Sequence, residues 1–197
     1  MEFFRGYGSF SPEKFLMMEK KLLQRIDKAL GMPGVVQLLC DRLSSSDLNS
    51  LLLGVFSEKT ARITPAGLLN AYTGNRFVQP SSIDPIAFGE FSLTWMKAAR
   101  AAGFYSLELS PLAPLGSCSA IGTVHQNKVL TALRGTEVVA DATNVMALES
   151  VCRRKRDGFP EEVVHLSAVH RHVRAQEVPK VPGFSSHFGV FALTSAG

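Results

Sequence analysis

Two strand-like segments near the C-terminus decide the fold. They read Val-Val-His-Leu-Ser-Ala-Val-His-Arg-His-Val-Arg-Ala-Gln at 163–176 and Ser-His-Phe-Gly-Val-Phe-Ala-Leu-Thr at 186–194. Both are rich in β-branched and aromatic residues, which favour extended backbone. Pro179, Pro182 and Gly183 lie between them and interrupt regular structure. We therefore predict two strands that form an antiparallel hairpin.

Polar and aromatic side chains are spaced two residues apart in both segments. Successive side chains of a strand point to opposite faces. The first segment therefore places four polar residues on one face: His170, His172, Arg174 and Gln176. The second places His187 and Phe191 together, with Gly189 between them to admit a flat ligand. If the two faces coincide, the hairpin offers the groups that bind phosphate, a base edge and an aromatic ring. An amphipathic hairpin with a polar outer face explains the pattern equally well.

The rest of the chain divides into a helical first part and a mixed second part. Two candidate helix starts, Ser11-Pro12 and Thr64-Pro65, each have a capping hydroxyl followed by proline. We predict helices at about 12–30, 45–56, after 65, 85–102 and 143–156, and strands at 104–109 and 128–134. A linker-like segment at 73–85 suggests two regions, a helical N-terminal region at 1–80 and an α+β core at 81–197.

Composition indicates a globular chain. Of 197 residues, 46% are apolar and 19% are charged, which supports a buried core and argues against wholesale disorder. No apolar run is long enough to span a bilayer, and the N-terminus lacks a secretory signal pattern. We therefore expect a cytoplasmic protein with no membrane partner. The net charge of +4 permits a polyanion such as tRNA but does not require one.

The hairpin also resembles motif 2 of the class II aminoacyl-tRNA synthetases. Val173-Arg174-Ala175-Gln176, a ten-residue loop and His187-Phe188-Gly189-Val190-Phe191 follow that motif's order and spacing. The resemblance implies that Arg174 binds the ATP α-phosphate, Gln176 reads the adenine amino group, Phe191 stacks on adenine and His187 lies near the outer phosphates. Gln176 departs from the family, which usually has glutamate there.

Two further stretches agree with this resemblance. Residues 95–112, which include Gly103-Phe104 and Pro111, are similar to motif 1, a long helix followed by a strand that forms the family's dimer interface. Leu133-Arg134-Gly135-Thr136-Glu137 resembles the loop that meets the substrate amino group, which would make Thr136 and Glu137 substrate-binding residues.

The resemblance implies an α+β fold, an antiparallel sheet flanked by helices. It also implies a homodimer that binds ATP, Mg²⁺ and an amino acid or similar small carboxylate, with Arg174 catalytic in adenylate formation. No motif 3 follows motif 2, so we expect a core truncated at its C-terminus. The alternative is a catalytically silent synthetase paralogue that acts as a regulatory or interaction subunit.

Three other features suggest different chemistry. Cys118 lies in a Gly/Ser-rich stretch that superficially resembles a nucleophile turn. His165, His170 and His172 could suggest zinc, but His165 has the opposite strand parity and no thiolate or carboxylate cluster lies near. The basic run 153–156 fits either a helix end or a nucleic-acid patch. We favour polar strand residues for the histidines, an incidental thiol for Cys118 and a helix end for the basic run.

Overall fold

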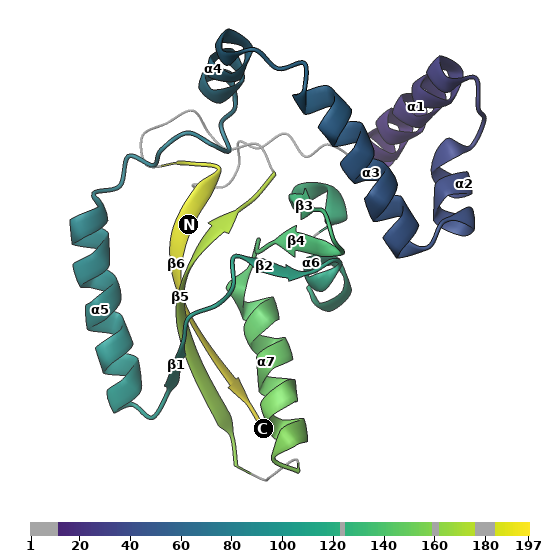
Figure 1. The fold of residues 1–197 in the computed structure, drawn as a ribbon. Coiled ribbons are helices and arrows are strands. Elements are labelled where there is room, and N and C mark those ends of the chain that lie inside the picture. The colour runs from purple at the N-terminus through teal and green to yellow at the C-terminus, as the bar shows by residue number, and fades with distance from the viewer. Residues whose placement is uncertain (1–11, 123–124, 159–161, 176–183) are drawn as a thin grey trace. The chain divides into compact units, whose positions relative to one another are not determined.

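The computed structural model describes residues 12–122, 125–158, 162–175 and 184–197. The described chain has an α+β fold with helices first and two small sheets after them (Figure 1). It divides into two compact units, Met1–Leu52 and Leu53–Gly197, which are described separately below. Among the described residues, no helix has both the length and the apolar character needed to cross a membrane.

The first unit is helical, as the sequence predicts. It contains α1 (Pro12–Leu30), α2 (Val35–Arg42) and the beginning of α3 (Ser45–Thr60). The carboxylate of Asp27 accepts hydrogen bonds from the backbone N–H groups of Gly34 and Val35, which ties α1 to the start of α2. Helix α2 was not predicted, because eight residues carry too short a pattern to stand out.

The second unit begins with the rest of α3, then α4 (Pro65–Gly74) and α5 (Pro85–Ala101). Capping side chains define both later helix starts. The hydroxyl of Thr64 accepts from the N–H of Gly67 at 3.1 Å, and the carboxylate of Asp84 accepts from the N–H of Ile86 at 2.8 Å. The predicted helices after 65 and at 85–102 are confirmed.

The main sheet is mixed. It contains β1 (Tyr105–Leu107), β5 (Val164–Val173) and β6 (His187–Ala196), in the order β1-β5-β6. The hairpin of β5 and β6 is antiparallel as predicted, but β1 runs parallel to β5. The prediction of an antiparallel sheet is therefore wrong for β1. The physical reason is the long connection between β1 and β5, which includes a helix and returns the chain in the same direction.

A second small sheet consists of β2 (Leu112–Pro114), β4 (Thr136–Val138) and β3 (Thr131–Ala132), all antiparallel. The helix α6 (Ser117–Ile121) and the 3-10 turn η1 (Gln126–Lys128) lie between β2 and β3 in sequence. Of the strand expected at 128–134, two residues are extended and paired in β3. The other elements are too short for strand periodicity to reveal them.

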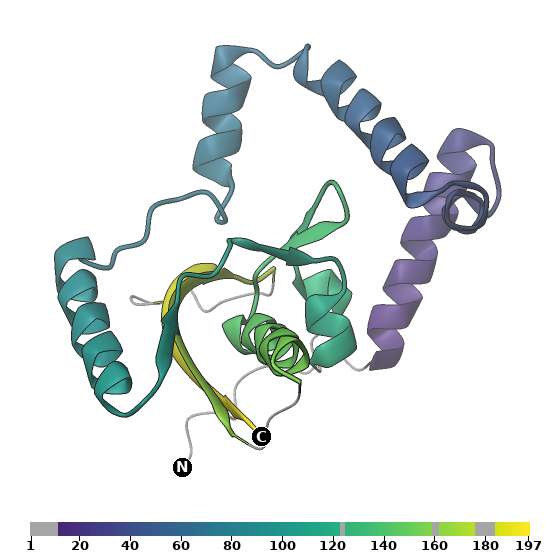
Figure 2. The same cartoon turned by 60° about the horizontal axis from the view of Figure 1, so that its bottom comes forward.

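Helices α5 and α7 (Ala142–Arg156) lie on opposite faces of the main sheet, as Figure 2 shows. The core lies on the α7 side, where five buried residues form one cluster: Ala142, Met146, Leu166, Ala168 and Ala192. On the other side, the Phe88 ring of α5 lies directly over Gly189 of β6. A β-carbon added at Gly189 would lie 2.1 Å from the Phe88 ring, so only glycine allows this approach.

Candidate functional site

The register of the hairpin separates the residues expected to form one site. Val173 pairs with His187, and Val169 pairs with Phe191, so His187 and Phe191 lie on the face toward α5. His172 pairs with Phe188, and both lie on the face toward α7. The predicted convergence of Arg174 with His187 and Phe191 on one surface is therefore wrong. An offset of one residue in pairing moves a whole set of side chains to the other face, and the sequence did not specify it.

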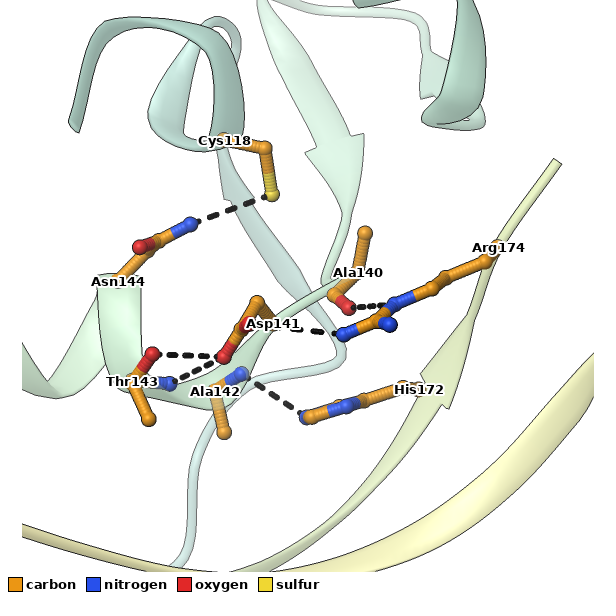
Figure 3. A network of polar contacts seen from close by, with 8 residues as sticks. All are labelled: Cys118, Ala140, Asp141, Ala142, Thr143, Asn144, His172 and Arg174. Atoms are coloured by element: carbon orange, nitrogen blue, oxygen red, sulfur yellow. Dashed lines mark hydrogen bonds and ion pairs between the residues drawn. The ribbon is translucent and has the colours of Figure 1, made fainter. Parts of the chain in front are cut away.

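Arg174 lies at the end of β5 and reaches the start of α7 (Figure 3). Its Nε donates to the carbonyl oxygen of Ala140 at 2.9 Å, and its Nη2 lies 3.5 Å from Oδ2 of Asp141. Its guanidinium carbon is 5.3 Å from the centroid of the Phe188 ring. Asp141 is the N-cap of α7, and its Oδ1 accepts from the N–H of Thr143 at 3.0 Å. A half-buried guanidinium is thus fixed beside the positive end of a helix.

His172 lies beneath this arginine and is only 2% exposed. Its Nε2 accepts a 2.9 Å hydrogen bond from the N–H of Ala142, so the ring is neutral with its proton on Nδ1. The pKa of His172 is lowered to about 4, mainly by burial; Asp141 opposes this shift, while the charges of His170 and Arg174 add to it. Within the described part of the chain, Nδ1 of His172 and Nε2 of His170 are buried without a hydrogen-bond partner.

His170 and His172, which could also suggest zinc, lie close to one another. Their ring centroids are 5.7 Å apart, but the described residues contain no group of three His, Cys, Asp or Glu side chains able to hold a metal ion. His165 lies at the far end of β5, where its ring packs on Phe104 and its Nδ1 contacts the hydroxyl of Ser195.

Glu137, expected to contact substrate, is completely buried within the second sheet. Its carboxylate accepts from the N–H groups of Gly116 and Cys118 at 2.8 and 2.9 Å and from Nε2 of Gln126 at 2.8 Å. Burial alone would raise the pKa of Glu137, but these hydrogen bonds outweigh it and lower the pKa. The ionised carboxylate therefore holds the loop around α6. Its neighbour Thr136 donates its hydroxyl to the carbonyl of Leu133 at 3.0 Å.

Cys118 does not have the surroundings of an activated nucleophile. The side chain is 2% exposed, and Nδ2 of Asn144 lies 3.6 Å from its sulfur. Burial raises the pKa of the Cys118 thiol, although Asn144 and the backbone of Ala140 oppose this effect. A protonated, buried thiol is a poor nucleophile.

On the α5 face, the side chains of His187 and Phe191 already have partners. Nε of Arg171 donates to Nδ1 of His187 at 3.1 Å, and Nε2 of His187 lies 2.5 Å from the carbonyl of Gln79. The ring of Phe191 packs against that of Trp95 with centroids 6.0 Å apart. Gln176 lies outside the described residues.

The basic run confirms the helix-end interpretation, because α7 ends at Arg156. Arg153 pairs with Glu149 at 2.7 Å, and Arg156 pairs with Asp157 at 3.0 Å. Arg154 donates to the carbonyl oxygens of Glu162, which precedes β5, and of Ala196, the last residue of β6. Three of these four cations therefore have partners among the described residues.

Sequence reasoning missed two residues of the Arg174 site. Phe188, on which the guanidinium stacks, was passed over because the motif assigns stacking to Phe191. The sequence indicates Asp141 as a candidate helix cap, because a cap depends on neighbouring residues. It does not indicate that Asp141 is also the partner of Arg174, which lies 33 residues away in the chain.

The sequence matches no protein-family model and has no significant match among curated proteins. Its distinguishing features are the α+β fold and Arg174, whose guanidinium is held at the start of α7.

Proposed function

We propose that the Leu53–Gly197 unit is a class II synthetase-like domain that binds ATP, and a small amino acid-like carboxylate, around Arg174. The observation that carries this proposal is the position of the guanidinium beside the first turn of α7, where Nε and Nη2 make its contacts with described residues. No described residue accepts a hydrogen bond from Nη1 of Arg174, so this atom can donate to a phosphate oxygen. The dipole of α7 also favours an anion at this helix start, although the N–H groups of Ala142 and Thr143 already donate to His172 and Asp141.

Aromatic stacking in this proposal falls to Phe188 rather than Phe191. Phe188 lies on the same face as His172 and already stacks with Arg174, whereas Phe191 packs on α5. Mg²⁺ would arrive with the nucleotide, because it is held mainly by phosphate oxygens and water.

The geometry favours the catalytically silent alternative over adenylate formation. Glu137 uses its carboxylate to hold the α6 loop, and His187 and Phe191 lie on the opposite face from Arg174. Adenylate formation develops charge on two phosphate groups, and each needs a preorganised donor. Arg174 supplies one. We therefore propose a binding or regulatory subunit.

Titration calorimetry with Mg²⁺-ATP tests the site. We expect Arg174→Gln to weaken binding by about tenfold or more, since a charge-assisted hydrogen bond is lost. The matched control is Arg171→Gln, because Arg171 is three residues away and exposed on the opposite face. Phe188→Leu should weaken binding more than Phe191→Leu. Equal affinities for Arg174→Gln and Arg171→Gln would remove Arg174 from the site.

Pyrophosphate exchange separates binding from activation. We expect no amino acid-dependent exchange of labelled pyrophosphate into ATP with any of the standard amino acids. Exchange at ordinary synthetase rates would instead show that the chain completes activation and would contradict the silent-subunit proposal.

A further inference from the structure

A cleft of about 330 Å³ opens between α5 and the main sheet. Its walls are mainly apolar, from Leu93 and Met96 of α5 and Val169 of β5. The polar part of the lining includes Lys97, Arg100 and, from β1, Ser106. The volume falls at the lower end of the range for small-molecule sites, about 300–1,000 Å³.

This cleft is separate from the Arg174 site. Ser106 pairs with Ser167, which has the same strand parity as Val169, and Val169 pairs with Phe191 of the α5 face. Arg174, in contrast, contacts the start of α7 on the other side of the sheet. Contacts of Phe88 with Gly189 and of Trp95 with Phe191 hold α5 over the cleft.

The charges of the lining have one sign. Lys97 and Arg100 are three positions apart on α5 and so project from the same flank of the helix. Both are exposed, and neither forms an ion pair with another described residue. None of the described residues that line the cleft is acidic. Two cations at the rim of an apolar cavity complement an anion that carries an apolar tail.

We propose that the cleft binds a small apolar carboxylate. The carboxylate would lie between Lys97 and Arg100, where Arg100 can donate two parallel hydrogen bonds. The tail would lie against Leu93, Met96 and Val169, where burial of its methylene groups favours binding. Both parts are needed, because a charge contact at an exposed rim contributes little by itself.

Calorimetry with three probes of equal chain length tests the ligand class: octanoate, octanol and octylammonium. Octanoate should bind about tenfold more tightly than octanol, and octylammonium should bind most weakly, because only the head group differs. Equal binding of octanoate and octanol would overturn the assignment of Lys97 and Arg100. Absence of octanoate binding at millimolar concentration would overturn the proposal as a whole.

Variants locate the bound probe. The double variant Lys97→Gln/Arg100→Gln should lower octanoate affinity about tenfold and leave octanol binding unchanged. Both residues are exposed, so the fold should persist, and circular dichroism checks this. Arg62→Gln, an exposed cation outside the cleft, is the matched control and should have no effect. Unchanged octanoate affinity in the double variant would overturn the proposal.

Arg174→Gln distinguishes this proposal from the nucleotide site. It should leave octanoate binding unchanged, because Arg174 contacts the opposite side of the sheet. If Arg174→Gln instead lowers octanoate affinity about tenfold, the carboxylate binds beside α7 and its assignment to the cleft is wrong. Weakened ATP binding with unchanged octanoate binding is the expected pattern for two separate sites.

Discussion

At the scale of single residues, two buried groups of opposite character organise the polar interior. His172 is kept neutral because its Nε2 accepts from the start of α7, while Glu137 is kept ionised by three donors. Each group is tied to one protonation state, since the other state would leave its partners unsatisfied. Both should therefore be visible in the free energy of unfolding.

The first prediction concerns the pH dependence of stability. The pKa of His172 is about 4 in the fold against 6.5 when exposed, so the unfolded chain binds more protons between these values. Its contribution is complete above pH 6.5 and is lost as pH falls toward 4. From pH 7.5 to 5 the free energy of unfolding should fall by about 2 kcal/mol from this residue. Urea denaturation of wild type and His172→Gln measures the difference. The exposed His165→Gln should behave as wild type; an unchanged pH dependence in His172→Gln would contradict the prediction.

The second prediction concerns Glu137. Glu137→Gln places an amide N–H₂ against N–H donors from Gly116, Cys118 or Gln126. The free energy of unfolding should fall by about 2–3 kcal/mol, since a hydrogen-bonded buried charge is lost and a donor is left unsatisfied. The control is Glu149→Gln in the partly exposed pair with Arg153, which should cost less than about 1 kcal/mol. Chemical denaturation at pH 7 measures both, and equal costs would argue against the role of Glu137.

At the scale of elements, α5 is attached to the main sheet by contacts of two of its aromatic rings with β6. Gly189 leaves room for the ring of Phe88, and Trp95 packs on Phe191 beside it. This arrangement uses two of the aromatic residues of α5 within the chain. Phe91 remains 52% exposed and Trp95 48% exposed.

The third prediction follows from that approach. Gly189→Ala places a methyl group where Phe88 lies, so the ring or the helix must shift. The free energy of unfolding should fall by about 1–3 kcal/mol, as for other overpacked sites, and the fluorescence of Trp95 should change. Gly89→Ala in α5 is the control: nothing lies within 4 Å of its added β-carbon, so it should stabilise the helix by about 0.5–1 kcal/mol. A neutral Gly189→Ala with unchanged fluorescence would show that α5 is not held there.

At the scale of the whole molecule, the exposed aromatic side chains of α5 bear on assembly. The resemblance of 95–112 to motif 1 implies a two-fold symmetric homodimer, and we keep this as a prediction. Sedimentation equilibrium at tens of micromolar should show twice the chain mass of 21.4 kDa. Phe91→Ser should shift the equilibrium toward monomer, while Ile63→Ser, at another exposed apolar position, should not. A wild-type monomer would count against both the dimer and the motif 1 assignment.

The sequence by itself determined the elements that carry long local patterns. Proline after a capping residue marked α4 and α5, alternation marked the β5–β6 hairpin, and caps together with apolar spacing marked the N-terminal helical region. These signals are local, since caps and periodicity involve residues a few positions apart. Short elements such as β2 and α6 gave no comparable signal.

Only the tertiary structure decided which side chains meet. The register placed Phe191 away from Arg174, the crossover made β1 parallel to β5, and burial turned Glu137 into a support for the α6 loop. Each outcome depends on contacts between residues far apart in the chain. A one-residue offset between strands exchanges their two faces without altering either strand's own pattern, and so the site could not be read from spacing alone.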